Sequence, residues 1–165
     1  MIFIAVGANL PAPDGSPPLS TAKRAMAALA NLSGLELHAL SSFWESAPIP
    51  PSDQPLYVNA VAALRGNTTP EALLQTLQSI EEAFGRERSV PNAPRSLDLD
   101  IIDLNGLVRN DANPILPHPR AHLRAFVLCP LAELAPSWEH PVLGSSVLEL
   151  LAALPPQSLR RIRTT

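Results

Sequence analysis

This sequence has little of what several protein classes require. Cys129 is the only cysteine among its 165 residues, which excludes an internal disulfide. No apolar run reaches the roughly 18 residues of a membrane-spanning helix, and no basic and apolar leader segment appears. We therefore expect a soluble, cytoplasmic protein with no membrane partner.

The familiar phosphate-binding loops are also missing. The chain has neither a GxxxxGKS/T nor a GxGxxG sequence, so a bound nucleotide would have to be held by arginines and a metal ion. There is no cluster of cysteines and histidines, which disfavours zinc. Four phenylalanines, two tryptophans and one tyrosine leave little surface for stacking sugars, which disfavours a glycosidase.

The net charge is small, and all but one of the lysine and arginine residues are arginines. A net charge of -3 argues against nucleic acid as a partner, because proteins that bind the phosphate backbone are usually basic. Lys23 is the only lysine, and arginine is the residue that binds phosphate or carboxylate with two parallel hydrogen bonds. Six arginines lie between 86 and 124: Arg86, Arg88, Arg95, Arg109, Arg120 and Arg124.

Length and hydrophobic content predict one domain over residues 1–165. We expect strands at 1–7, 35–44, 57–66 and 97–103, and helices at 19–31, 69–84, from 119 or 121 to 134, and 147–154. Ser20 and Thr69 are the candidate N-caps of the first two helices. Asn105-Gly106 indicates a turn, with a short hairpin returning around Leu107 and Val108.

This order of elements predicts the α+β class and a ferredoxin-like antiparallel sheet. We expect the helices on one face of the sheet and a site on the other. The segment 45–55, which has four prolines, would be a stiff loop beside the strands and a plausible pocket wall.

Asp98 and Asp100 lie inside an otherwise apolar strand, SLDLDII. Residues two apart share one face of a strand, so the two carboxylates would lie together. Such a pair suits Mg²⁺, which is commonly held by one or two carboxylates, waters and phosphates. With the neighbouring arginines, the pair indicates phosphoryl transfer, which depends on positioning and charge neutralisation. The alternative is two aspartates on a solvated sheet face.

Other candidate residues each have an ordinary structural interpretation. His118, between two prolines, could be a structural hydrogen-bonding residue, Arg124 a capping residue and Phe126 a core residue. Tyr57 and Asn59 share a strand face, which fits either a binding or a structural role. Asn59 offers a donor and an acceptor to a ligand, and Phe126 offers a ring face.

Five segments together resemble the 6-hydroxymethyl-7,8-dihydropterin pyrophosphokinases of folate biosynthesis. They are FIAVGANL at 3–10, SSFWESAPI at 41–49, QPLYVNAV at 54–61, APRSLDLDII at 93–102 and PHPRAHLRAFVLCPLAELAP at 117–136. The resemblance implies an enzyme that transfers the β,γ-pyrophosphoryl group of ATP to the hydroxymethyl oxygen of the pterin and releases AMP. A monomer is expected.

The resemblance also implies roles for individual residues. Asp98 and Asp100 would hold two Mg²⁺ ions and, with Arg86 and Arg95, form the catalytic set. The ATP-binding residues would be Gln78, Glu81, Arg86, Arg88, Arg95, Ile101, His118 and Arg124. The pterin-binding residues would be Ala47, Pro48, Ile49, Tyr57, Asn59 and Phe126.

Pro91 and Asn92 depart from the family pattern, which usually has a basic residue and a bulky aromatic there. The alternative hypothesis is therefore a pterin- or nucleotide-binding module with weak or no catalysis.

Overall fold

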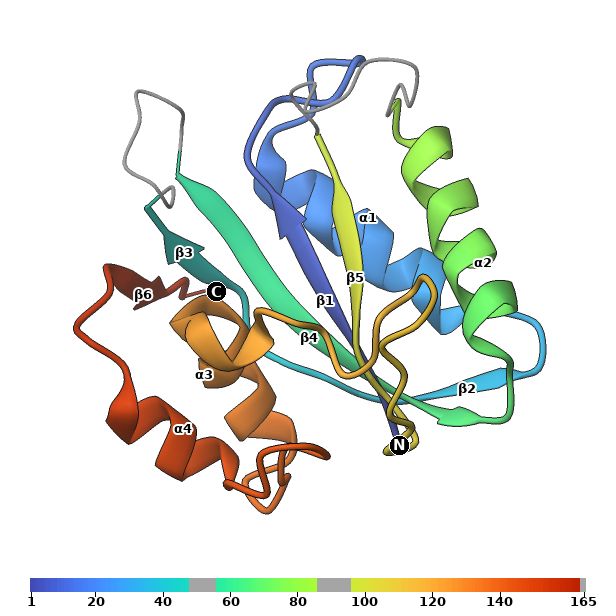
Figure 1. Cartoon of the computed structure of the whole chain (residues 1–165). Helices are drawn as coiled ribbons and strands as arrows, with labels where there is room; N and C mark the ends of the chain where they lie inside the picture. The colour runs from blue at the N-terminus through green and yellow to red at the C-terminus, as the bar shows by residue number, and fades with distance from the viewer. Residues whose placement is uncertain (48–55, 86–95, 164–165) are drawn as a thin grey trace.

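The computed structural model describes residues 1–47, 56–85 and 96–163, which form an antiparallel sheet with helices on both faces (Figure 1). The strands are β1 (Ile2–Ala8), β2 (Leu35–Leu40), β3 (Trp44–Ser46), β4 (Tyr57–Gly66), β5 (Asp98–Leu104) and β6 (Leu159–Arg161). The helices are α1 (Pro18–Ala30), α2 (Pro70–Ala83), α3 (Ala125–Leu134) and α4 (Val147–Ala153), with a 3-10 turn η1 (Ala121–Leu123). The predicted ferredoxin-like α+β class is confirmed.

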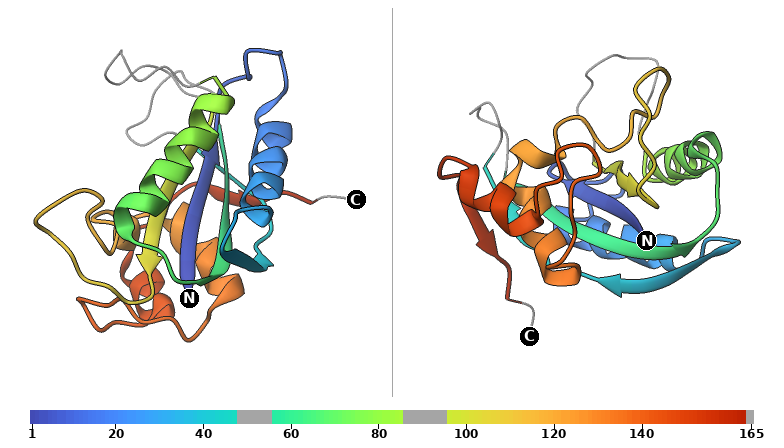
Figure 2. Two further views of the ribbon diagram at one scale, coloured as in Figure 1. Left: turned by 90° about the vertical axis from the view of Figure 1, so that its right-hand side faces the viewer. Right: turned by 60° about the horizontal axis from the view of Figure 1, so that its bottom comes forward.

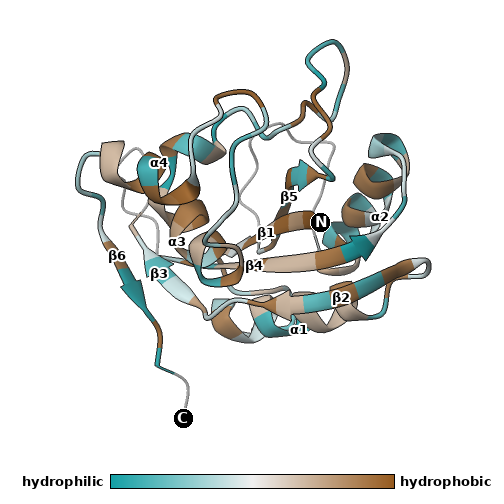
Figure 3. Ribbon diagram, turned by 90° about the horizontal axis from the view of Figure 1, so that it is seen from below, coloured by the Kyte–Doolittle hydropathy of each residue, from teal (hydrophilic) through white to brown (hydrophobic). Residues whose placement is uncertain are grey.

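The sheet has the strand order β5-β1-β4-β3-β6, and every neighbouring pair is antiparallel. The long strand β4 pairs with β3 through its first residues and with β2 through its later ones, so β2 and β3 lie along the same edge of β4. Strands β1 and β4 are interior, and in Figure 3 β1 is drawn in hydrophobic brown, as the buried position of a central strand requires.

Alternation along the strands divides the apolar residues between two cores. Ile2, Ile4 and Val6 of β1 pack toward α1 and α2, whereas Phe3 packs with residues of α3 and α4. The left view of Figure 2 shows α1 beside one face of the sheet, whereas residues of α3 and α4 pack in the core on the opposite face. The expectation of helices on one face only was therefore wrong, because α3 is apolar enough to bury residues against the second face.

Three local expectations were also wrong. Helix α1 begins at Pro18 after Pro17, so Ser20 lies inside the helix and is not its N-cap. The strand expected at 35–44 is interrupted at Ser41, whose Oγ atom accepts the Val61 N–H at 2.8 Å in place of a main-chain acceptor. Asn105 and Gly106 form the expected turn, but the returning chain forms no strand and makes only the isolated bridge between Arg109 and Leu116.

Two helix starts differ in their outcome. Thr69 caps α2 as predicted, since its side chain accepts the Ala72 N–H at 3.1 Å. The helix expected from 119 or 121 is instead split, because Arg124 is extended between η1 and α3. Among the described residues, none of the helices is both long enough and apolar enough to cross a membrane.

Candidate active site

A cavity of about 440 Å³ opens on the second face of the sheet, beside α3. Its walls come from β1, from the β3 and β4 pair, from β5 and from the η1–α3 junction. The lining residues are Ala5, Val6, Gly7, Ser46, Ala47, Tyr57, Asn59, Asp98, Asp100, Arg120, Leu123, Arg124, Phe126 and Val127. The cavity therefore brings together segments that lie far apart in the sequence.

Asp98 and Asp100 lie on the face of β5 that borders this cavity. Their neighbours Leu99 and Ile101 point the other way, into the core against α1 and α2. In the sheet register Asp98 is opposite Gly7 and Asp100 is opposite Ala5. Because these two residues of β1 are small, the carboxylates border open space instead of packed side chains.

His118 lies next to the aspartate pair, with its Nε2 atom 3.9 Å from Asp100 Oδ2. Its main-chain N–H donates to the Ile102 carbonyl at 2.9 Å, and its Nδ1 atom accepts the Arg120 N–H at 3.1 Å. Burial, together with the charges of Arg124 and Arg120 and against that of Asp98, lowers the pKa of His118 to about 4. His118 is therefore neutral at pH 7, with its proton on Nε2, which faces the site.

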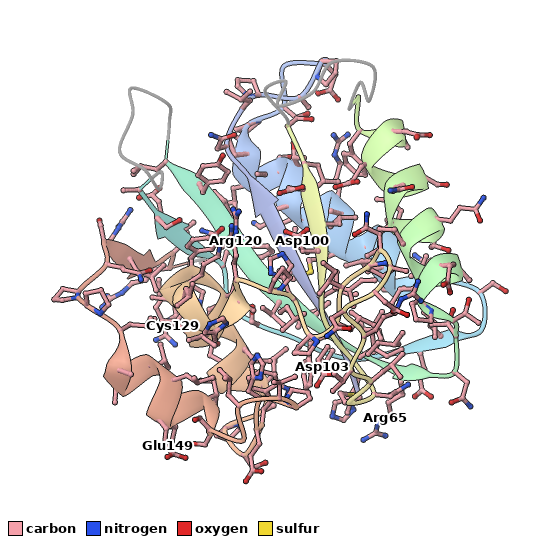
Figure 4. The ribbon with its side chains drawn as sticks, in the orientation of Figure 1. Arg65, Asp100, Asp103, Arg120, Cys129 and Glu149 are labelled. Carbon is pink, nitrogen blue, oxygen red and sulfur yellow. The ribbon has the colours of Figure 1, made fainter. Side chains whose placement is uncertain are left out.

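Two arginines of the η1–α3 segment line the same cavity as the carboxylates. Figure 4 shows Arg120 and Asp100 beside one another, and both line the cavity. The guanidinium carbon of Arg124 lies 5.5 Å from the centre of the Phe126 ring, a distance at which a cation is attracted to the face of an aromatic ring. Positive side chains thus line the same cavity as the aspartate pair.

Asn59 forms the inner wall on the opposite side of the cavity. It is buried, and its Nδ2 group donates to Ser46 Oγ at 2.7 Å. Tyr57 lies two residues earlier on the same strand and Ala47 directly follows β3. These residues provide polar groups and an apolar surface close to Phe126, which suits a flat heteroaromatic ligand.

Seven predicted residues line the cavity, an eighth lies next to it, and others lie elsewhere. The seven lining residues are Ala47, Tyr57, Asn59, Asp98, Asp100, Arg124 and Phe126, with His118 adjacent. Gln78 and Glu81 lie on α2, outside the walls of the cavity. Ile101 is buried in the core, so any contact with a ligand would have to come from its main chain.

Glu81 has a clear structural position. Its side chain is 2% exposed, and its Oε2 atom accepts the Leu99 N–H at 2.9 Å. Leu99 stands between the two aspartates, so this bond ties the end of α2 to the part of β5 that carries them.

Several predicted residues fall outside the described part of the chain. They are Pro48, Ile49, Arg86, Arg88 and Arg95, together with the departures Pro91 and Asn92.

Sequence reasoning missed part of the wall. Ser46, Arg120 and Leu123 line the cavity, and so do Ala5 and Gly7 of β1. The alternation in IFIAVG could have indicated Ala5 and Gly7, since they share the face opposite Ile4 and Val6. Nothing in the sequence separates Arg120 from the other arginines.

Comparison with known proteins assigns the family. The family described as 7,8-dihydro-6-hydroxymethylpterin-pyrophosphokinase (HPPK) matches residues 3–136. A 2-amino-4-hydroxy-6-hydroxymethyldihydropteridine pyrophosphokinase of Pseudomonas aeruginosa is 39% identical over 161 residues, which cover 98% of this chain and 96% of that protein. The protein of the same name from Synechocystis sp. is 38% identical over 148 residues, covering 90% of this chain and 73% of its own length.

A longer relative shows the same region inside a larger chain. The folic acid synthesis protein fol1 of Pneumocystis carinii is 38% identical over 117 residues, which are 71% of this chain and 16% of that protein. With a family match that spans most of the sequence and a cavity lined by the residues of its central motifs, the chain belongs to the 7,8-dihydro-6-hydroxymethylpterin-pyrophosphokinase family.

Proposed function

We propose that this protein transfers the pyrophosphoryl group of ATP to 6-hydroxymethyl-7,8-dihydropterin, giving the pterin diphosphate and AMP, as a step of folate biosynthesis. Family membership supports the reaction, since the relatives carry the name of this pyrophosphokinase. The observation that carries the proposal is that one cavity is lined by Asp98 and Asp100 together with Arg120 and Arg124. Carboxylates for a metal ion and arginines for phosphate are what this chemistry requires.

Asp98 and Asp100 fit a magnesium site, and we propose two Mg²⁺ ions there. Carboxylate oxygens are the ligands that this hard cation prefers. Among the described residues no group of three or more His, Cys, Asp or Glu side chains could hold a metal ion, so the remaining ligands would be phosphate oxygens and water. Bound Mg²⁺ neutralises charge on the triphosphate.

His118 and Arg124 would hold the phosphates. Neutral His118 has its N–H at Nε2, from which it can donate a hydrogen bond to a phosphate oxygen. Arg124 can bind a phosphate with two parallel hydrogen bonds. The roles of Arg86, Arg88 and Arg95, and of Gln78, Glu81 and Ile101, in ATP binding remain predictions from the family resemblance.

The pterin would lie between Asn59 and Phe126. Because Asn59 Nδ2 donates to Ser46, its Oδ1 atom is the one available to accept a hydrogen bond from the pterin edge. Phe126 would stack on the ring, with Tyr57 and Ala47 beside it and Pro48 and Ile49 as further predicted contacts. The pterin hydroxymethyl oxygen would then bond to the β-phosphorus of ATP while the bond from that phosphorus to the AMP oxygen breaks, and the hydroxyl proton would be released to water.

The direct test is an assay with ATP, Mg²⁺ and hydroxymethyldihydropterin in which the nucleotide product is identified. AMP is the expected product. Formation of ADP, or no product at saturating substrate, would contradict the proposal and favour the alternative of a binding module with weak or no catalysis.

Charge removal at the carboxylate pair tests the metal site. Asp98→Asn and Asp100→Asn should each lower kcat/KM on the order of 100-fold or more, with an unchanged circular dichroism spectrum. Asp111→Asn is the matched control, since Asp111 is exposed and does not line the cavity. Full activity in either site variant would rule out the metal-ligand assignment.

Cytoplasmic location and the monomeric state remain predictions.

A further inference from the structure

We infer that Gln157 is a positioning residue for Arg124. Gln157 lies between α4 and β6, beyond the region 3–136 that the family match covers. Its Oε1 atom accepts the Ala125 N–H at 2.9 Å, and its Nε2 group donates to the Leu123 carbonyl at 3.1 Å. One side chain therefore holds the peptide groups on both sides of Arg124.

The backbone at Arg124, which Gln157 holds, needs hydrogen bonds from outside the η1–α3 segment. Arg124 has φ -123° and ψ 108°, so the chain is extended for one residue between η1 and α3. The side chain of Arg124, the N-cap residue, does not cap α3, and the first N–H groups of a helix have no partner within it. Gln157 supplies the acceptor for the first of them.

Residues of this junction line the cavity, so its conformation matters for the site. Leu123, Arg124 and Phe126 are all lining residues. The backbone at Arg124 sets the direction of its side chain, whose guanidinium lies over the Phe126 ring in the cavity, and a rotation there would move the group by ångströms. Displacements of this size at a catalytic site lower rates substantially.

Gln157 is itself held from two sides. Before it, Val147 and Leu150 of α4 are buried in the core shared with α3. After it, β6 pairs with β3, with Leu159 opposite Ser46, and Arg160 binds Glu45 at 2.9 Å. Figure 1 shows the chain passing from α4 along α3 to β6. The C-terminal segment thus contacts two parts of the cavity wall. It contacts β3 through β6, and it contacts the η1–α3 junction through the hydrogen bonds of Gln157.

The test replaces Gln157 by a residue of similar length without hydrogen-bonding groups. This inference rests on the proposed role of Arg124 in binding ATP. Gln157→Met should lower kcat/KM for ATP roughly tenfold. In an Arg124→Ala background the same change should have less than about a twofold effect, because two residues that act through one contact are not additive.

A matched control separates positioning from stability. Ser146→Ala removes the capping box of α4, in which Ser146 Oγ accepts the Glu149 N–H at 3.1 Å. It should lower the melting temperature by several degrees, about as much as Gln157→Met, and leave kcat/KM within about twofold. Gln157→Glu, which keeps an acceptor for Ala125 but no donor for Leu123, should fold and still lose activity.

The outcomes distinguish the two levels of the proposal. If Arg124→Ala has wild-type kcat/KM, the proposed role of Arg124 is wrong and the inference fails with it. If Arg124→Ala is impaired and both Gln157 variants are fully active, or if Gln157→Met has the same effect in both backgrounds, Gln157 does not act through Arg124. The proposed function then stands without it.

Discussion

Small side chains at the centre of the sheet leave room for the site. Gly7 stands opposite Asp98 on one side and Asn59 on the other, so it separates the carboxylate wall from the Asn59 wall. A Cβ atom at Gly7 would meet only Asn59 Oδ1, at 3.8 Å, an ordinary contact. Neither packing nor backbone conformation requires glycine at position 7. The absence of a side chain there leaves space for the cavity.

Phe126 is the aromatic residue on which the pterin hypothesis depends. Phe126→Ala should weaken pterin binding roughly tenfold and ATP binding much less, since the lost contact is a ring stack. Fluorescence titration with each ligand separately measures both affinities. Equal losses for pterin and ATP would contradict the stacking role.

The chain offers a matched control for this substitution. Phe84 also has an arginine above its ring, with Arg24 at 5.0 Å from the ring centre, and it packs against the other core. Phe84→Ala removes the same kind of pair away from the pterin wall and should leave pterin affinity unchanged.

At the scale of elements, α2 supports the strand that carries the aspartates. The helix begins at Pro70 with Thr69 as its cap, and Glu81 near its end binds the Leu99 N–H. The cap stabilises α2, and Glu81 of α2 holds β5. The stability of the helix and the position of β5 are therefore connected.

Removing the cap tests the contribution of α2 to stability. Thr69→Ala should lower the free energy of unfolding by about 1 kcal/mol, because the Ala72 N–H loses its acceptor. Urea unfolding measures the change. Thr68→Ala is the control, since the neighbouring Thr68 side chain does not cap the helix. Equal losses for the two variants would mean that the cap is not the cause.

At the scale of the whole molecule, a buried cluster joins the segment after α3 to the end of β5. Trp138 Nε1 donates to Asp103 Oδ2 at 2.8 Å, and the Trp138 and His140 rings meet edge to face. His140 Nδ1 accepts the N–H groups of Val142 and Leu143. These bonds require an unprotonated Nδ1 atom.

This cluster makes stability depend on pH. Burial, with a contribution from His122 and against that of Asp103, lowers the pKa of His140 below its ordinary value of 6.5. The unfolded chain therefore binds the proton first as the pH falls. His140 stabilises the fold fully above pH 6.5, and this contribution declines below it by up to about 1.4 kcal/mol per pH unit until the folded pKa is reached.

His140→Asn should reduce this dependence, since an asparagine oxygen can accept the two N–H groups and does not titrate. Urea unfolding at pH 7.5 and at pH 5 measures the difference for each variant. The exposed His38 provides the control His38→Asn, which should keep the wild-type dependence. A wild-type pH dependence in His140→Asn would contradict the role of this histidine.

Local patterns predicted much of the fold because they depend on neighbours within one turn or one strand. The strand at 57–66 has the predicted bounds, and α2 begins after the predicted cap at Thr69. The interruption at Ser41 was not predictable in this way, because it depends on a bond to Val61, twenty residues away in the sequence. The short strand β6 was missed for the same reason, since it pairs with β3.

The sequence by itself determined that Asp98 and Asp100 share a face, since side chains alternate along any strand, and its motifs determined the family. Only the tertiary structure decided which residues line the cavity together with the two carboxylates. The η1–α3 junction crosses the second face of the sheet and brings Arg120 and Arg124 to the cavity, and Gln157 reaches that junction from 32 residues beyond Ala125. These contacts depend on how whole elements pack to bury apolar surface, and no local pattern specifies them.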